Sequence, residues 1–238
     1  MKKFFILLAV VLFSFYSCEK VNDIIENTDE PLTDAQIAEG LKEALKVGTD
    51  TAVAIVSKVD GYFADSLIKI FLPPDADKMI AVAGILGTQQ QIDDLILMVN
   101  RSAEDAAPEA IDIFVTAITN MTITDAVNIL HGSDSAATHF LRENTYFELY
   151  QTFKPEIETS LDKELVLGAS ANTTWISVTS IYNAAYPADP VDTDLSTHVT
   201  EKALDGLFEK IKDEEKQIRE DPLARVSDIL KDVFGELD

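Results

Sequence analysis

The sequence predicts a mainly α-helical protein: a multi-helix, bundle-like single domain with at most one short extended or β segment near residues 66–72. Three observations support this fold class. A composition rich in alanine, leucine, isoleucine and glutamate favours helix, whereas glycine and proline number 9 and 8 in 238 residues. Hydrophobic residues make up 47% of the chain, which is enough for a substantial core. Apolar residues recur at spacings of three and four along most of residues 32–238, so the helices can share that core.

The segment 32–48 carries the signals of a complete helix. Thr33 can cap its first turn, and Gln36, three residues later, completes a capping box. Gly40 costs about 1 kcal/mol relative to alanine, which is acceptable where another helix packs closely. Gly48 is expected to end the helix, because glycine readily adopts the left-handed conformation.

The rest of the chain is expected to be helical, with three interruptions. In residues 66–74 the apolar side chains lack helical spacing and two prolines end the run, so this segment is expected to be extended or a short strand. Residues 187–198 are typical of an irregular loop, and Pro155 is expected to separate two helices. Helices are expected over residues 49–61, 75–87, 88–107, 109–120, 123–132, 133–144, 146–153, 155–165, 172–187, 199–221 and 222–235.

The first 17 residues have the organisation of an export signal. Lys2 and Lys3 precede an apolar run from Phe4 to Phe15. That run has the length of a signal peptide and is too short to span a bilayer. Polar, acidic sequence follows at once and cannot continue into hydrocarbon. The segment is therefore predicted to direct export.

The single cysteine, Cys18, directly follows this segment. A small residue before a cysteine resembles the lipobox of bacterial lipoproteins, although Phe15 and Tyr16 stand where leucine and a small residue are commoner. The resemblance implies that residues 1–17 are a lipoprotein signal peptide and that Cys18 is lipidated. Its acyl chains would then anchor the protein to a membrane. The alternative is an ordinary secretory signal with a chance cysteine.

Residues 18–31 are expected to carry the lipidated cysteine and an acidic tether. Fully extended, the tether reaches roughly 40 Å. Nothing after Cys18 forms an aspartate-led retention signal. We therefore expect an exported protein anchored in the outer membrane, facing either the periplasm or the exterior.

The net charge of −23 restricts the partners of the domain. Such an acidic surface repels phosphate backbones, so nucleic-acid binding is not expected. It also repels anionic head groups, so the domain should stand off the membrane that its lipid enters. With Cys18 used as the anchor, no thiol remains for a disulfide, a thiolate zinc site or a cysteine nucleophile.

One cluster of polar residues is a candidate site. Asn100, Arg101 and Glu104 lie close together on the helix expected after Thr88, and they could form the polar wall of a pocket. The alternative is a salt-bridged helix flank, because Arg101 reaches Glu104 and Asp105 at helical spacings of three and four.

Motifs for metal binding and catalysis are absent from the sequence. An EF-hand starting at Asp192 would need glycine where Thr197 stands and glutamate where Ala203 stands. The three histidines lack the spacing of a zinc site. No nucleophile elbow, Walker A loop or dinucleotide-binding glycine pattern occurs. We therefore expect no metal and no cofactor.

Several segments occur in a characteristic order: LTDAQIAEGLKEALKVGTDTAV, IKIFLP, NRSAEDAA, ITDAVNIL, AATHFL, FKPEI and VTEKALDGLF followed by EEKQIR. Together they resemble a bacterial lipoprotein family known as domain of unknown function 4197. The resemblance covers about residues 30–235 and is weakest over 164–195. It implies an exported, lipid-anchored, mainly helical domain, and it carries neither an activity nor a functional residue.

These features favour a lipid-anchored, non-enzymatic binding or scaffold module of the cell envelope, with an envelope protein as its partner. One alternative is a helical pocket for a small ligand or lipid, which requires a deep apolar cavity. The other is a hydrolase that uses carboxylates, which requires titratable groups with shifted pKa values in one cleft. A scaffold should instead expose an apolar patch with a polar rim.

Overall fold

The computed structural model describes residues 31–166, 168–192 and 194–235 of the chain. The described residues from Thr33 onward form one compact unit. This unit is mainly helical and bundle-like, so the predicted fold class is confirmed. The predicted signal peptide, Cys18 and nearly all of the tether lie outside the described residues.

Helices and short 3₁₀ turns make up the described structure, apart from one short hairpin. They are α1 (Asp34–Val56), η1 (Pro74–Ala76), α2 (Asp77–Leu86), α3 (Gln89–Ala106), η2 (Ala107–Glu109), α4 (Ala110–Asn120), α5 (Ile123–Leu130), α6 (Ala136–Leu161), β1 (Glu164–Val166), β2 (Ala169–Ser170), α7 (Ala171–Ala185), α8 (Ser196–Glu220), η3 (Pro222–Ala224) and α9 (Asp228–Gly235), where η marks a 3₁₀ turn.

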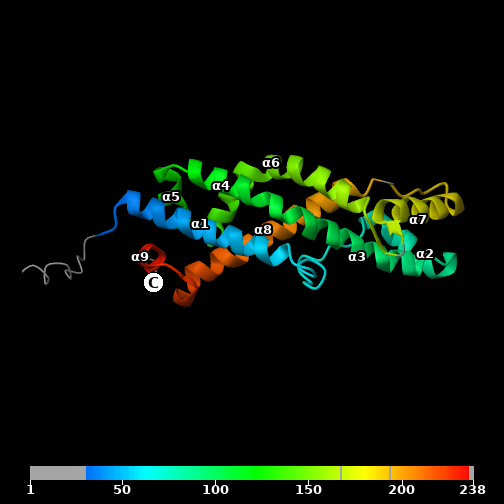
Figure 1. The fold of residues 1–238 in the computed structure, drawn as a ribbon, viewed down its shortest axis with the longest axis horizontal. Coiled ribbons are helices and arrows are strands. Elements are labelled where there is room, and N and C mark those ends of the chain that lie inside the picture. The colour runs from blue at the N-terminus through cyan, green and yellow to red at the C-terminus, as the bar shows by residue number, and fades with distance from the viewer. Residues whose placement is uncertain (1–30, 167, 193, 236–238) are drawn as a thin grey trace, which may run out of the picture. The chain divides into compact units, whose positions relative to one another are not determined.

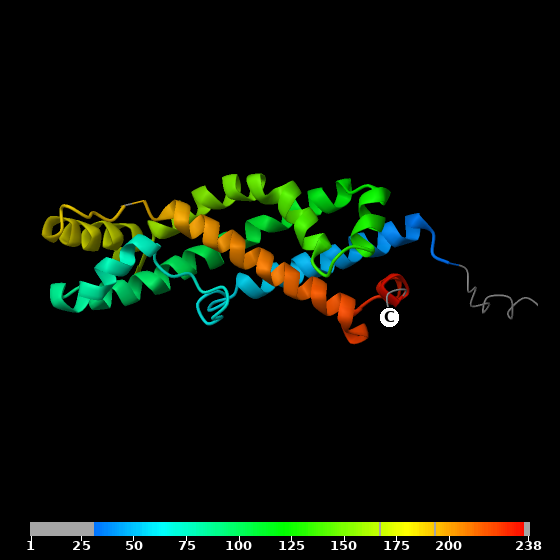
Figure 2. The same cartoon turned by 180° about the vertical axis from the view of Figure 1, so that it is seen from behind.

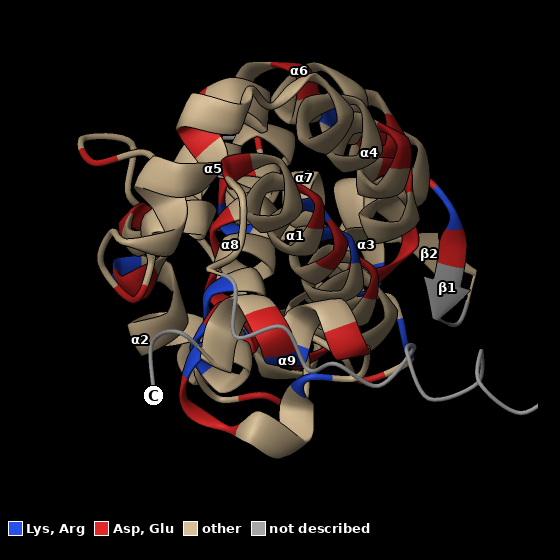
Figure 3. Ribbon diagram, turned by 90° about the vertical axis from the view of Figure 1, so that its left-hand side faces the viewer, with Lys and Arg blue, Asp and Glu red and all other residues tan. Residues whose placement is uncertain are grey.

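The core lies between α1, α3, α4, α6 and α8. The long helix α8 packs against α1 and α6, and α3 packs against α6. Figures 1 and 2 show α2 and α7 at one end of the bundle, with α5, α9 and the start of α1 at the other. Figure 3 looks onto the α5 and α9 end and shows acidic residues on α1, α8 and α9.

Helix α1 begins as predicted but ends later. The capping box is confirmed: Gln36 N donates to Thr33 Oγ1, and Thr33 N donates to Gln36 Oε1. Gly40 does allow close packing, because a Cβ there would lie 2.5 Å from Cγ2 of Val233 on α9. The predicted end at Gly48 is wrong. Gly48 is buried at the contact with α8, and this packing outweighs the low helix propensity of glycine.

The predicted break at Pro155 is also wrong, since α6 runs through it without ending. Phe153 and Ile157, on either side, are fully buried and hold the helix against the core. Pro155 itself is exposed, and so is Gln151, whose carbonyl would have received the missing N–H. Water can therefore hydrate that carbonyl, which reduces the cost of the proline.

The segment near 66–72 forms no strand. Residues 66–68 make a turn, and 69–73 are irregular. Among the described residues, β1 and β2 are the two strands, and they form a short antiparallel hairpin that the sequence did not predict. Strands of two or three residues are too short to show an alternating pattern of apolar and polar side chains.

Candidate functional site

A long connection between α1 and η1 carries the most unusual arrangement in the described structure. Residues 57–73, here called the anchored loop, contain turns but no helix or strand. In Figure 1 it is the cyan segment that follows α1. Connections of this length within a compact domain are uncommon, and they are often functional. Its backbone also has to find hydrogen-bond partners outside regular structure.

Asn100 on α3 supplies such partners to one residue of the anchored loop. Its side chain is fully buried. Its Oδ1 accepts a hydrogen bond from Ile70 N at 2.9 Å, and its Nδ2 donates to Ile70 O at 2.8 Å. The carboxamide thus pairs with the backbone of Ile70 as a neighbouring strand would.

Glu104, one turn further along α3, holds the first part of the loop. Its carboxylate is buried, and Oε1 accepts from Tyr62 N at 3.2 Å and Phe63 N at 3.4 Å. Arg101 bridges this carboxylate and the loop, with 2.6 Å from Nη1 to Glu104 Oε2 and 2.6 Å from Nη2 to Asp60 Oδ1. Partial burial alone would lower the pKa of Arg101, but these two carboxylates raise it.

The three residues predicted as a candidate site are therefore brought together on one face of α3. Asn100, Arg101 and Glu104 direct their polar atoms to the backbone and the Asp60 side chain of the anchored loop. These loop partners could not be predicted from local patterns, because they lie some 30 to 40 residues earlier in the chain.

Helix α8 holds the loop from a second side. The buried Tyr62 hydroxyl donates to Ala203 O at 2.8 Å, and its ring packs on Gly206, where a Cβ would lie only 2.7 Å from the ring. Lys210 Nζ lies 2.7 Å from Asp65 Oδ2. His198 Nε2 lies 2.9 Å from the carbonyl oxygen of Phe71. Contacts from α3 and α8 therefore hold the loop at several points between Asp60 and Phe71.

The anchored loop exposes three large apolar side chains beside exposed polar ones such as Lys58, Asp60 and Ser66. Val59, Leu67 and Phe71 are 76%, 77% and 59% exposed. Lys69 lies between two aromatic rings, with Nζ 3.8 Å from the centroid of Phe63 and 5.8 Å from that of Phe71. A rigid backbone thus presents large apolar side chains and a cation stacked on aromatic rings to solvent.

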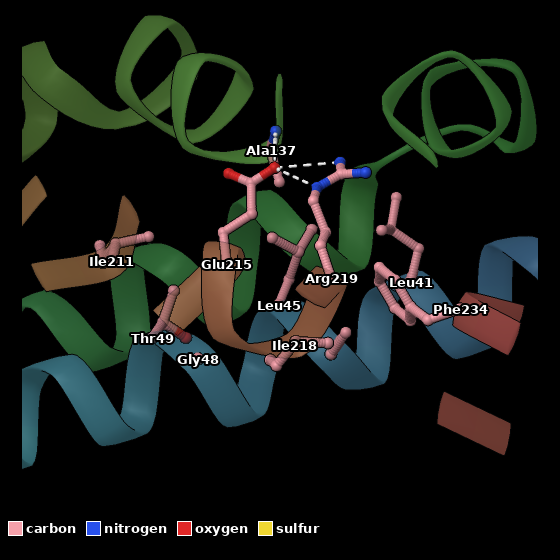
Figure 4. A pocket seen from close by; sticks show the side chains of 11 residues that line it. Leu41, Leu45, Gly48, Thr49, Ala137, Ile211, Glu215, Ile218, Arg219 and Phe234 are labelled. Carbon is pink, nitrogen blue, oxygen red and sulfur yellow. Dashed lines mark hydrogen bonds and ion pairs between the residues drawn. The ribbon is translucent and has the colours of Figure 1, made fainter. Parts of the chain in front are cut away.

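A second polar cluster was missed by sequence reasoning. Glu215 on α8 is buried and accepts hydrogen bonds from the first turn of α6, namely from Ala137 N, Thr138 N and the Thr138 hydroxyl. Arg219, one turn later, contacts Glu215 at 3.0 Å and donates to the last carbonyls of α5, those of Ile129 and Leu130. Figure 4 shows both side chains among apolar neighbours.

This pair caps two helix ends with charges of the favourable sign. A carboxylate stabilises the amino end of a helix, and a cation stabilises the carboxyl end. The signal in the sequence was the position of both residues on the apolar stripe of α8, which includes Ile211 and Ile218. A charged pair on such a stripe indicates a buried, hydrogen-bonded ion pair.

The concave surfaces differ in size and lining. A small, partly open and largely apolar pocket of about 20 Å³ lies beside Glu215 and Arg219 (Figure 4). It is about large enough for one water molecule. A larger concavity of about 750 Å³ is an open groove along α1. Its lining residues are Ala35, Ala38, Glu39, Lys42, Glu43, Lys46, Val115, Ile118, Thr119, Ser227 and Ile229.

A comparison with protein families gives one match. The family described as "Protein of unknown function (DUF4197)" matches residues 31–235, which is most of the chain. The chain belongs to this family. No curated protein and no solved structure matches it. The description of the DUF4197 family assigns no activity, so the geometry of the domain carries the functional argument.

Two further features of this DUF4197 domain concern metal ligands and the length of its apolar helices. Within the described ranges, no group of three or more His, Cys, Asp or Glu residues is placed to hold a metal ion. No single described helix is long and apolar enough to cross a membrane. Gln89–Asn120 and Ile123–Leu130 together are long and apolar enough, but the chain bends by 102° between them.

Proposed function

We propose that this protein is a non-enzymatic binding module of the cell envelope, anchored by lipid on Cys18 in the outer membrane. In this proposal the anchored loop is its contact surface for an envelope protein. The observation that carries the proposal is the exposure of Val59, Leu67 and Phe71 on a loop that buried polar side chains hold in place.

Rigidity is what makes this loop suited to binding. A flexible loop would lose conformational freedom on forming a complex, which weakens affinity. Here the ordering has already occurred on folding, because the side chains of α3 and α8 fix its backbone. Large apolar and aromatic side chains are also the residues that contribute most to protein interfaces.

The two alternatives have less support. A ligand carrier would need an enclosed cavity far larger than the 20 Å³ beside Glu215. A hydrolase would need carboxylates with raised pKa values converging in a cleft. Glu214 has a raised pKa, caused by partial burial and by the neighbouring Asp213, but it does not line the small pocket beside Glu215 or the open groove along α1.

The test is crosslinking in intact bacterial cells. Full-length, affinity-tagged protein is compared with Leu67→Ser, Phe71→Ser and the control Leu223→Ser. Leu223 is 91% exposed and lies in η3, outside the loop. We expect one or two envelope proteins to be captured by the wild type and the control, and about tenfold less by the loop variants.

Equal capture by all four proteins, or none by the wild type when it is abundant and folded, would refute the loop as the contact surface. The anchor is tested separately with Cys18→Ala. Mass spectrometry of the amino-terminal peptide should find acylated Cys18 in the wild type, and the variant should leave the membrane fraction. An unmodified Cys18 in the mature protein would refute lipid anchoring.

A further inference from the structure

The two longest stretches without a charged residue between residues 31 and 235 lie in α2–α3 and around α7. Asp, Glu, Lys and Arg make up 26% of the sequence, yet none occurs in residues 79–92 or in residues 165–188. The first stretch covers most of α2 and the start of α3, and the second includes all of α7. At the average frequency, about ten charged residues would be expected in these 38 positions.

The fold brings the two stretches together. Helix α2 packs against α7, and both pack against α3. They form the end of the bundle opposite α5, α9 and the start of α1 (Figures 1 and 2). The other end carries acidic residues on α1, α8 and α9 (Figure 3). We call α7 and the part of α2 from Met79 onward the uncharged end. Lys78, at the start of α2, pairs with Asp189 at the edge of this region.

The uncharged end exposes apolar side chains. In α2, Met79 and Ala83 are buried, whereas Ile85 is 84% exposed. In α7, Ile176 and Ile181 are partly exposed, and Tyr186 lies just after its last residue. Both helices therefore use only part of their apolar surface inside the domain.

We propose that the uncharged end is a contact surface for a second copy of this chain. Electrostatics favours this occupant over others. Two copies with a net charge of −23 repel each other wherever their carboxylates approach within about one Debye length, roughly 8 Å at physiological ionic strength. Contact through the uncharged ends brings apolar surfaces together and keeps most carboxylates of the two copies apart.

A basic partner would not require this arrangement. Carboxylates at the contact would attract it, speed its association and add specificity. A contact surface without charged residues instead avoids electrostatic repulsion by a partner that is as acidic as the chain itself. A second copy has the same charge by definition. In a twofold-symmetric dimer, the same surface of each copy would form the contact.

The experiment uses photocrosslinking of the full-length protein in cells. Two copies with different affinity tags are expressed together, with photoreactive benzoylphenylalanine in place of Ile85 or Ile181. We expect a product of twice the monomer mass that carries both tags. The matched control places the same photoreactive group at Leu223, which is 91% exposed and lies in η3, and it should give no such product.

A pair of substitutions tests the electrostatic argument. Ile181→Glu introduces a charge into the contact and Ile181→Gln a side chain of similar size without charge. With the photoreactive group at position 85, we expect the doubly tagged product to fall about tenfold in the Glu variant, and much less in the Gln variant. Thermal unfolding of both variants confirms that each is folded.

Products formed at positions 85 and 181 only with another protein or with lipid would overturn the proposal, as would an absence of products. Equal losses in the Glu and Gln variants would overturn the electrostatic argument. Because these positions lie outside the anchored loop, their result is independent of the loop variants.

Discussion

The anchored loop and the uncharged end both expose apolar side chains, but different forces hold them in place. The loop has an irregular backbone, and side chains of α3 and α8 satisfy its hydrogen bonds. At the uncharged end, helices satisfy their own backbone, and apolar packing around the fully buried Trp175 holds α7. Trp175 Nε1 has no hydrogen-bond partner among the described residues. Irregular backbone therefore needs buried polar partners, whereas exposed helices need only a packed face.

The largest expected effect is at Glu104. Glu104→Ala removes the acceptor for Tyr62 N and Phe63 N and leaves Arg101 with one carboxylate partner fewer. We expect a loss of about 3 kcal/mol in the free energy of unfolding, measured by urea denaturation. Glu109→Ala, at an exposed site of the η2 turn, is the control and should stay within about 0.5 kcal/mol. Equal small effects in both would show that the loop does not depend on its polar anchors.

A smaller effect is expected at Gly206. Gly206→Ala places a Cβ 2.7 Å from the ring of Tyr62, which is buried and hydrogen-bonded to Ala203 O. Overpacking of this kind should cost about 2 kcal/mol and loosen the anchored loop. Hydrogen exchange should accelerate at Tyr62 and Phe63, while α7 amides at the uncharged end stay protected. Uniform acceleration would contradict separate support of the two regions.

A smaller, pH-dependent effect on the free energy of unfolding is expected at Asp65 in the anchored loop. The hydrogen bond from Lys210 lowers the pKa of Asp65, partial burial opposes this, and the backbone N–H of Leu67 adds to the lowering. A carboxyl with a lowered pKa stabilises the fold above its unfolded value of about 3.9, and this contribution disappears as the pH falls through the folded value. Asp65→Asn should therefore cost about 1 kcal/mol at pH 7 and almost nothing near pH 2. A difference that does not change with pH would contradict this assignment.

The smallest effect is expected at Ile85, an exposed residue of the uncharged end. Ile85→Ser should change the free energy of unfolding by no more than about 0.5 kcal/mol, because the side chain is 84% exposed. Met79→Ala, on the buried face of the same helix, should cost about 3 kcal/mol. A large loss for Ile85→Ser at low protein concentration would mean that Ile85 packs within one chain.

Local signals in the sequence predicted much of this fold. The capping box of Thr33 and Gln36 and the close packing at Gly40 were correct, because each depends on residues near in the sequence or on a general packing rule. The breaks at Gly48 and Pro155 were wrong, because burial of their neighbours against distant helices outweighs local propensity.

The candidate site was predictable only in part. The spacing of Asn100, Arg101 and Glu104 placed them together on α3, but their partners in the anchored loop depend on tertiary contacts. Glu215 and Arg219 were overlooked, because acidic residues are common in this chain. Their place on the apolar stripe of α8 was the signal that distinguished them.

The position of that pair in the chain affects the order in which the fold can be completed. Glu215 lies 78 residues after Ala137, and Arg219 lies 89 residues after Leu130. During synthesis, α5 and α6 emerge before α8. The carboxyl end of α5 and the amino end of α6 therefore lack these hydrogen-bond partners until the carboxyl-terminal part of α8 follows. A nascent or truncated chain that stops before Glu215 therefore lacks the pair that joins these helices, so the final fold waits for nearly the entire polypeptide.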